Sequence, residues 1–373
     1  MSSEEALTVA ALVGRLEEAF DPAWAEEWDR VGLICGDPSA RVEGALVTLD
    51  ATAEAVDRAA ALGANVLVTH HPPFLEAPDT YLPQPGPSGT LVVALAAGVS
   101  VTSFHTSLDR APAGADALSQ ALGLTIVGPL ERSAEPVTVI VTYVPGESAE
   151  GVRAALASAG AGRLGLYEKC SFESEGTGRF EPAAGADPVV QAGPAGVPEV
   201  RVEMVAPRSI AARAVEAARA AHPYEEPVVL ALEARRARGA ARLGRICSWE
   251  GDGGVLELAH RVRERLGVTP RVWGDVERTV ERIAVANGSA GSLLGYALDA
   301  CDVCIAGEVR YHDALDAVAR GLTIIEVGHD ASEWPLVTVL GNEVRRCAGG
   351  GVTVTVEQPQ MAWRTVEDAD DRG

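Results

Sequence analysis

The fold class follows from residues 44–74, which read GALVTLDATAEAVDRAAALGANVLVTHHPPF. An apolar run over 44–50 is followed by an Ala-rich helical pattern over 51–63 and by a second apolar run over 65–70. Short apolar runs bounded by turn residues are typical of buried strands, and a glycine such as Gly63 commonly follows the last residue of a helix. This order predicts two parallel strands with a helix packed against them.

The same alternation continues on both sides of a central segment. Before that segment, helical patterns cover 5–20, 91–98 and 115–124, and a strand pattern covers 99–105. After it come a helical pattern and three strand patterns, at 256–267, 281–288, 302–308 and 322–328. We therefore expect a split α/β domain, residues 1–133 and 241–373, built on a mostly parallel sheet.

The central segment, residues 134–240, has its own pattern. A strand over 137–145 and a helix over 148–160 precede a stretch rich in Gly and Pro that is typical of strands joined by turns. A helix over 210–221 and a strand over 228–234 follow. The order strand, helix, two strands, helix, strand predicts a small inserted domain of the ferredoxin-like (α+β) class.

Composition narrows the class of protein. Lys and Arg total 31 against 53 Asp and Glu, which gives a formal net charge of −22. Such an acidic chain repels nucleic acid and anionic lipid, so we expect neither as a partner. We interpret the negative charge as a source of solubility. Residues 366–371 form a short acidic tail. The acidic N-terminus lacks the basic stretch of a signal peptide, and no apolar run reaches the roughly 18 residues of a spanning helix. We expect a cytoplasmic protein.

The six cysteines are scattered and do not resemble a disulfide framework. One CxxC occurs, formed by Cys301 and Cys304. It has no second pair and lies within an apolar run, so it favours a buried strand over a zinc knuckle.

Potential metal ligands follow three of the predicted strands. His70 and His71 end one strand, and His105 ends another, with Asp109 in the loop that enters the next helix. Adjacent strand residues point to opposite faces, so two adjacent histidines at a strand end would serve two neighbouring ions better than one. The alternatives are a pair of turn histidines, and an aspartate that caps a helix or turn.

The third strand ends at Gly328 and is followed by His329 and Glu333. Their spacing of four places both on one face of a helix, one turn apart. A surface His–Glu pair is the alternative. Together, four of the seven histidines, one Asp and one Glu fall at the carboxyl ends of apolar strands, the edge where open parallel sheets bind ligands. Imidazole and carboxylate are ligands for Zn, Mn, Fe or Ni, and a carboxylate can bridge two ions.

Three further segments could line the same edge. Glu308 and His312 are four apart, and we consider both as catalytic candidates, for a proton shuttle or an anion contact, although a plain helix start is the alternative. The segment 27–38 suits a substrate-side loop. The small-residue loop 287–294 suits an anion at a helix start, but it does not match a P-loop. We find no cofactor-binding motif.

The motifs HHPPF, SFHTSLDRAPAGADALSQALGL, GEVRYHDAL and GHDASE resemble the GTP cyclohydrolase 1 type 2 homologue family of dinuclear-metal hexameric proteins. The resemblance covers nearly the whole chain, and YEKCSFESEGTGRFEPAAGADP and HPYEEP resemble the insert of its long form. It implies a split α/β domain around a two-metal centre, an inserted small domain and a toroidal homohexamer.

By position, the resemblance implies a set of five ligands with His105 adjacent to them: His70, His71, Asp109, His329 and Glu333. The chain departs from the family at Arg30, where a small polar residue is usual, and at Asp330, where an aromatic residue is common. The first bears on substrate preference and the second on the charge near the metals.

Two functions follow as alternatives. One is metal-assisted hydrolysis of a nucleotide or phosphoester-type small molecule, with two divalent ions per chain that activate a water molecule. The other is a non-catalytic metal-handling or regulatory protein that acts through protein partners. Whether the protein is an enzyme is left open by the sequence, because no nucleophile accompanies the ligands and no base or triphosphate contacts for GTP are identifiable.

Overall fold

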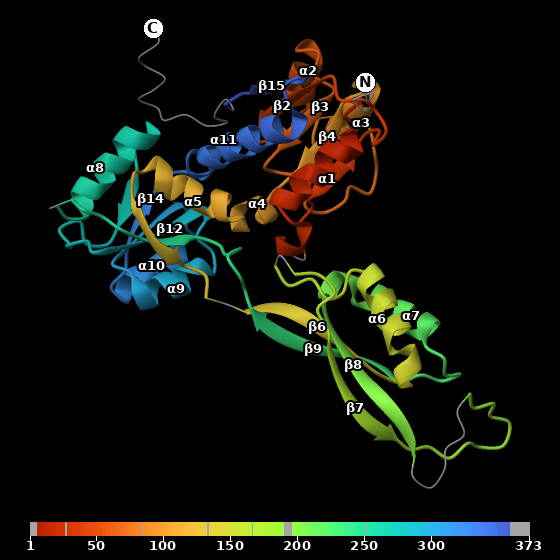
Figure 1. Ribbon diagram of the computed structural model, residues 1–373. Helices are drawn as coiled ribbons and strands as arrows, with labels where there is room; N and C mark the ends of the chain where they lie inside the picture. Colours follow the sequence, from red (N-terminus) through yellow and green to blue (C-terminus); the bar gives the residue numbers. More distant parts are fainter. Residues whose placement is uncertain are drawn as a thin grey trace. The chain divides into compact units, whose positions relative to one another are not determined.

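The computed structural model describes residues 6–358 except 27, 84, 133, 166, 190–195 and 252. The chain divides into two compact units, Met1–Arg132 with Ala240–Gly373, and Ser133–Gly239 (Figure 1). The acidic tail expected over 366–371 lies outside the described residues. Within the described part, no helix combines the length and the apolar character needed to cross a membrane.

The first unit contains a five-stranded sheet in the order β1-β4-β3-β2-β15. Its strands are β1 (Gly32–Cys35), β2 (Gly44–Thr48), β3 (Val66–Thr69), β4 (Ser100–Ser103) and β15 (Thr353–Val356). The last four run parallel and β1 pairs antiparallel with β4. Every residue of β2, β3 and β4 is buried, as expected of a sheet covered by helices on both faces.

Alternate residues of this sheet face different helices. Val47 and Val68 pack with the helices α1 (Val9–Ala19) and α11 (His329–Ala348), whereas Leu46 and Leu67 pack with α2 (Ala53–Ala61) and α3 (Pro87–Ala97). This alternation is the period-two geometry of a strand. The short elements α4 (Thr106–Arg110) and η1 (Pro22–Trp24), a 3₁₀ turn, complete this part of the unit.

The first unit also contains a six-stranded sheet in the order β11-β14-β13-β12-β10-β5. Its strands are β5 (Thr125–Pro129), β10 (Arg245–Ser248), β11 (Arg271–Trp273), β12 (Arg282–Ser289), β13 (Val303–Glu308) and β14 (Thr323–Glu326). Strands β12, β13 and β14 run parallel, and the other pairings are antiparallel. The predicted α/β class is confirmed, but the prediction of one mostly parallel sheet is wrong, because this unit has two sheets and each contains antiparallel pairings.

The physical reason lies in the strands that flank the insertion. In the sequence, β5 precedes the second unit and β10 follows it, and the two strands pair antiparallel. Their sequences, TIVGP and RICS, are not continuous apolar runs like VLVT of β3, so they give no clear strand pattern. Beyond them, Leu130 N–H donates to Gly244 O at 3.2 Å and Glu131 N–H to Leu243 O at 3.1 Å, which holds the two connections together.

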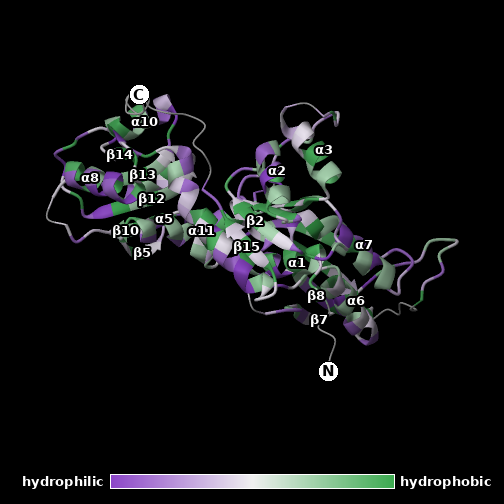
Figure 2. Cartoon of the chain, turned by 90° about the horizontal axis from the view of Figure 1, so that it is seen from above, coloured by the Kyte–Doolittle hydropathy of each residue, from purple (hydrophilic) through white to green (hydrophobic). Residues whose placement is uncertain are grey.

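Four helices cover the second sheet, two on each face. The helices α5 (Pro112–Ala121) and α8 (Val255–Leu266) pack on the face that carries Ile283 and Ile305. The helices α9 (Leu293–Ala300) and α10 (Tyr311–Ala319) pack on the other face, which carries Cys304. Figure 2 shows the resulting concentration of hydrophobic residues in the strands. Cys304 lies in β13 and is buried, and all six cysteines are free thiols.

The second unit is a four-stranded antiparallel sheet in the order β7-β8-β6-β9, with two helices on one face. Along the chain come β6 (Ala134–Val144), η2 (Gly146–Ser148), α6 (Ala149–Ser158), β7 (Phe172–Gly178), β8 (Val197–Pro207), η3 (Arg208–Ile210), α7 (Ala211–Ala221) and β9 (Val229–Ala237). Ile140 and Val202 pack beneath the helices with Val152 and Ala214. The assignment of this unit to the ferredoxin-like class stays a prediction.

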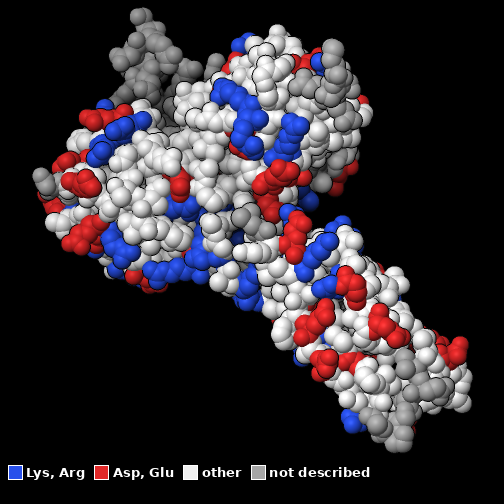
Figure 3. Space-filling model, viewed as in Figure 1, with Lys and Arg blue, Asp and Glu red and all other residues white. Residues whose placement is uncertain are grey.

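Charged side chains of both signs occur on each unit on the face shown in Figure 3. The net charge of −22 therefore coexists with basic side chains on this face. The chain as a whole is a mixed α/β protein with several sheets.

Candidate metal centre

The first unit brings together six side chains that the sequence analysis selected. His70 and His71 directly follow β3, and His105 lies between β4 and α4. Asp109 lies within α4, in a helical turn and not in the loop expected from the sequence. His329 and Glu333 form the first turn of α11. Ends of strands from two different sheets thus contribute to one cluster.

Glu333 lies at the centre of this cluster. Its Oε2 atom is 2.9 Å from His71 Nε2 and 3.1 Å from His329 Nε2. Its Oε1 atom is 3.7 Å from His70 Nε2, which in turn is 3.8 Å from Asp109 Oδ1. One carboxylate therefore faces imidazoles on two sides, the arrangement that a bridging ligand requires.

Three overlapping groups in the cluster have the spacing of metal ligands. They are His70 with His71 and His105, His71 with His329 and Glu333, and His70 with Asp109 and Glu333, and within each group the candidate ligand atoms lie within 4.8 Å of one another. Two of the three groups share Glu333. We find no further group of this kind among the described residues.

The second nitrogen of each imidazole is held by an acceptor. Nδ1 of His70 lies 3.0 Å from Phe104 O, and Nδ1 of His71 lies 2.8 Å from Asp50 Oδ1. A carbonyl or an ionised carboxylate can only accept a hydrogen bond, so Nδ1 is the donor in both rings. In the neutral ring Nε2 then keeps a free lone pair, and both Nε2 atoms face the cluster.

His105 and His329 repeat the pattern. Nδ1 of His105 lies 2.9 Å from Asp29 Oδ1, and Nδ1 of His329 lies 3.3 Å from Glu308 Oε1. Histidine ligands of metals commonly donate their other N–H to a carboxylate or carbonyl, which fixes the ring orientation. The four histidines therefore fit a metal centre better than they fit a set of turn residues.

Burial supports the same interpretation. The exposed fractions of His70, Glu333 and Asp109 are 0%, 3% and 9%. His70 Nε2 and Asp109 Oδ1 are buried and have no hydrogen-bond partner among the described residues. Because unpaired buried polar atoms are costly, an ion that binds both of them would remove an unfavourable term.

The cluster shifts the pKa values of its members. Burial raises the pKa of Asp109. Burial also opposes the charge of Glu333, but its contacts with His329, His70 and His71 outweigh burial and lower the pKa of this carboxyl well below its usual value. Without a bound ion, the negative charge of Glu333 therefore attracts protons to the imidazoles around it.

Two imidazoles respond strongly. Contacts with Asp50 and Glu333 outweigh the effect of burial and raise the pKa of His71 to about 10. The hydrogen bond to Glu333 raises the pKa of His329 to about 9, against a smaller effect of burial. At neutral pH both rings would therefore carry a second proton and a positive charge, until a metal ion replaces that proton.

The carboxyl end of β12 makes room for Glu333. Gly288, the second-last residue of this strand, has a φ of +56°, and a Cβ atom there would collide with Glu333 Oε1. The Ser332 hydroxyl accepts from Gly288 N–H at 2.9 Å and donates to His329 O at 2.7 Å. The lack of a side chain at Gly288 thus lets the end of β12 pack against the first turn of α11, and the anion site expected over 287–294 stays a prediction.

Of the two catalytic candidates, only Glu308 reaches the cluster. Its carboxylate contacts His329 and its side chain is 56% exposed. His312 is exposed and lies against Tyr311, with ring centroids 5.4 Å apart, and in the described chain we find no interaction that joins it to the six residues.

The two departures from the family pattern have local roles. Arg30 is exposed and its Nε donates to Leu75 O at 3.4 Å. Asp330 Oδ1 accepts from Ala331 N–H at 3.0 Å at the start of α11. Neither hydrogen bond is made to one of the six candidate ligands.

Sequence reasoning did not select Asp29 and Asp50. Asp50 had a usable signal, because it ends the apolar run over 44–50 beside the strand that carries His70 and His71. Asp29 lies in the segment 27–38, which the sequence analysis expected at the same edge as a substrate-side loop, but nothing in the sequence connects it with His105, 76 residues later. Its role depends on tertiary contacts.

Comparison with known proteins agrees with this geometry. The family model for Duf34/NIF3 (NGG1p interacting factor 3) matches residues 7–361. The chain belongs to the Duf34/NIF3 family. The GTP cyclohydrolase 1 type 2 homolog of Mycobacterium bovis is 36% identical over 93% of this chain and 94% of its own length. The Bacillus subtilis protein of that name is 33% identical over 86% and 87%.

Solved structures of similar proteins match nearly the whole of this chain. A Bacillus cereus protein related to NIF3 has a TM-score of 0.66 and 28% identity, over 97% of this chain and 100% of that chain. A Staphylococcus aureus protein has a TM-score of 0.69 with 24% identity, over 98% and 100% of the two chains, and supports the fold alone.

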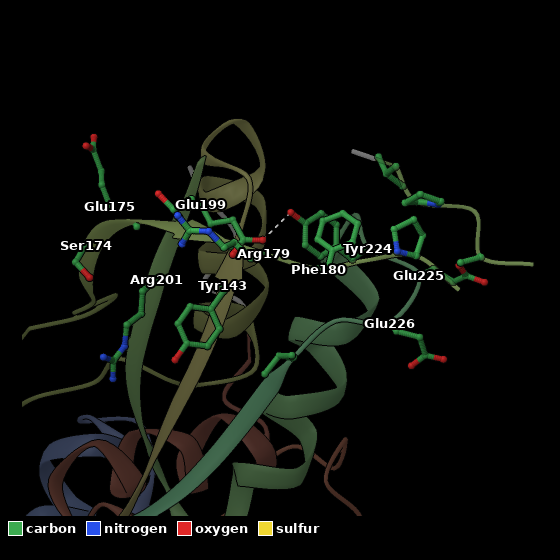
Figure 4. Close-up of a pocket in the computed structure, with 18 residues that line it drawn as sticks. Tyr143, Ser174, Glu175, Arg179, Phe180, Glu199, Arg201, Tyr224, Glu225 and Glu226 are labelled. Carbon is green, nitrogen blue, oxygen red and sulfur yellow. Dashed lines mark hydrogen bonds between the residues drawn. The ribbon is translucent and has the colours of Figure 1, made fainter. Parts of the chain in front are cut away.

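The second unit contains a separate cavity of about 660 Å³ (Figure 4). Tyr143, Phe180 and Tyr224 supply aromatic walls, and the Tyr224 hydroxyl donates to Glu199 Oε1 at 2.7 Å. Although this cavity is large, the groups with metal-ligand spacing lie in the first unit. The chemistry of the six residues therefore identifies the candidate site better than cavity size does.

Proposed function

We propose that this protein binds two divalent metal ions per chain through His70, His71, His105, Asp109, His329 and Glu333. The observation that carries the proposal is the carboxylate of Glu333, which faces His71 and His329 on one side and His70 on the other. In this proposal Glu333 would hold both ions, with His71 and His329 on one side of it and His70 and Asp109 on the other. The donor set suits Zn, Mn, Fe or Ni.

We further propose a metal-dependent hydrolase that acts on a nucleotide or phosphoester-type small molecule. When bound, a pair of ions supplies an activated water molecule and stabilises negative charge on the substrate. The chain's own contribution is positional, because Asp29, Asp50 and Phe104 O orient three of the imidazoles. Glu308, exposed beside His329, is placed to accept or deliver a proton at the solvent side.

The names of the relatives suggest GTP as a substrate, and we treat GTP as one member of the class to be tested. A homohexamer and a ferredoxin-like class for the second unit complete the proposal. A second candidate function is metal handling through protein partners. It is favoured by the half-exposed side chains of His329 (39%) and Glu308 (56%), which give an ion a route to solvent.

The experiment that separates the two functions compares the metal-loaded protein with the chelated protein on a panel of nucleotides, including GTP, and phosphoesters. The hydrolase proposal predicts turnover that needs a divalent ion and survives alkylation of the cysteines, because no cysteine lies in the cluster. Binding of metal without turnover of any member of the panel would favour metal handling. Turnover abolished by alkylation of a folded protein would contradict the mechanism.

A further inference from the structure

The segment around Asp29 has a buried carboxylate between two exposed neighbours. Trp28 is 53% exposed and Arg30 is exposed, whereas the side chain of Asp29 is 0% exposed. Its Oδ2 accepts from Thr106 N–H at 2.8 Å and also from the Thr106 hydroxyl, and its Oδ1 faces His105 Nδ1 at 2.9 Å. Burial of a carboxylate is costly, so this one requires all three contacts.

Hydrogen bonds of Arg110 and Thr106 hold this segment against α4. The guanidinium of Arg110, which is 1% exposed, donates to Trp24 O at 2.9 Å and to Glu26 Oε1 at 2.5 Å. Glu26 N–H donates to the Thr106 hydroxyl at 2.9 Å. Trp24, Glu26 and Asp29 are therefore joined to the short helix that carries Asp109, and Asp29 is held in place before any ion binds.

The hydrogen bond to Asp29 determines which nitrogen of His105 carries the proton. Since an ionised carboxylate only accepts, Nδ1 of His105 carries the proton, and Nε2 of the neutral ring is the nitrogen that can bind an ion. A ring nitrogen of His105 lies within 4.8 Å of ligand atoms of His70 and His71. Its ring centroid lies 5.2 Å from that of His70 and 5.4 Å from that of His71.

We propose that Asp29 is a positioning residue that fixes the tautomer and orientation of His105, so that Nε2 of this member of the proposed ligand set can bind an ion directly. The inference rests on the proposed metal centre. It assigns a role to the WDR segment, residues 28–30, that is different from a substrate-side loop. It also identifies Arg110 as the residue that holds this segment to the centre.

The substitution Asp29→Asn tests the tautomer directly. Thr106 N–H needs an acceptor, so the amide oxygen of an asparagine faces Thr106 and its NH₂ group faces His105. Nδ1 of His105 must then accept, which moves the ring proton to Nε2, the atom that should bind the ion. The variant keeps the size of the side chain and reverses the polarity of one hydrogen bond.

The experiment is titration of the full-length protein with Co²⁺, followed by its absorption bands and by a competing chelator. We expect Asp29→Asn to bind Co²⁺ about 10- to 100-fold more weakly, the range typical for partners of metal-binding histidines. We expect His105→Ala to weaken binding at least as much, and Asp29→Asn to add no further loss in the double variant, because Asp29 acts through His105. The matched control is Asp37→Asn, an exposed carboxylate that bonds only to the local turn at Ser39 and Ala40.

Several outcomes would overturn the inference. Wild-type Co²⁺ affinity in folded Asp29→Asn removes the role of Asp29, and losses that add in the double variant show that Asp29 acts independently of His105. If Asp29→Asn does not fold, His105→Ala decides, since unchanged affinity in that variant excludes His105 as a ligand. A wild-type protein that binds no Co²⁺ refutes the proposed metal centre itself, a result distinct from the others.

Discussion

Gly288 is the residue whose replacement tests the geometry around Glu333 most locally. It combines a φ of +56° with a Cβ position that the Glu333 carboxylate occupies. We expect Gly288→Ala to displace Glu333 and to reduce the number of ions bound per chain, as measured by elemental analysis of folded protein. The control is Gly291→Ala, two residues beyond the end of β12, where φ is +43° and the nearest atom lies 4.0 Å away. Equal metal content in the two variants would contradict the prediction.

Protons should compete with metal ions for two histidines. The pKa of His71 is raised to about 10 and that of His329 to about 9, so both rings are charged near pH 7 before metal binds. We expect metal binding at pH 7 to release protons and the apparent affinity to rise as pH increases toward 9 to 10. Calorimetry in buffers of different ionisation enthalpy measures this release, and an enthalpy that does not depend on the buffer would contradict it.

The same shifts give a sign for the stability of the metal-free protein. A folded-state pKa above the unfolded value of about 6.5 stabilises the fold fully below that pH, and the effect is lost as pH rises through the folded pKa. For His71 and His329 the window therefore runs from about 6.5 up to about 9 to 10. We expect the midpoint of thermal unfolding of the chelated protein to fall across this window. If the midpoint of the wild-type protein stayed constant across this pH range while that of His71→Ala fell, the assignment would be contradicted.

At the residue scale, the candidate metal ligands could be predicted from the sequence, but the residues that hydrogen-bond to them could not. His70, His71, His105, His329 and Glu333 follow apolar strands, a pattern that is visible in the chain. Asp29 lies 76 positions before the histidine it contacts, and no local pattern records such a distance. His312 had the helical spacing from Glu308 that suggested a site, yet it lies on Tyr311, because spacing alone does not say which face a helix buries.

At the scale of elements, continuous apolar runs could be predicted as strands and short mixed segments could not. The strands β2 and β3 match the pattern over 44–70 because every position in them is buried. The helix α2 between them matches because one face of its Ala-rich run, with Val56 and Ala59, is buried. The strand β11 has three residues, and its pairing with β14 depends on the fold around it. The expectation of one mostly parallel sheet failed for this reason.

The insertion of the second unit leads to a prediction about elements. Leu130 and Glu131 pair with Gly244 and Leu243, so the two ends of the insertion lie side by side within the first unit. We expect a chain in which Ser133–Gly239 is replaced by a short Gly-Ser linker to retain metal binding, because all six proposed ligands lie outside that range. The measurement is metal content per folded chain, with His329→Ala in the shortened chain as the control. A folded shortened protein without metal would contradict the prediction.

At the scale of the whole molecule, the homohexamer is proposed from the family resemblance. Strand β9 exposes Leu230 and Leu232, at 40% and 45%, and β7 exposes Phe172 at 65%, but these strands are the two edges of the sheet and single exposed apolar residues are common. We expect light scattering at micromolar concentration to give about six times the chain mass of 38.7 kDa, and a monodisperse species at the mass of one chain would contradict the assembly.

The most direct test of the central claim is the number of metal ions per folded chain in wild type, Glu333→Ala and His329→Ala, measured by elemental analysis after reconstitution. Glu333 faces imidazoles on both sides, whereas His329 approaches only one of its oxygens. The account predicts two ions in wild type, reduced occupancy of both sites in Glu333→Ala and loss of mainly one ion in His329→Ala. Two ions retained in Glu333→Ala, or at most one ion in wild type, would contradict it.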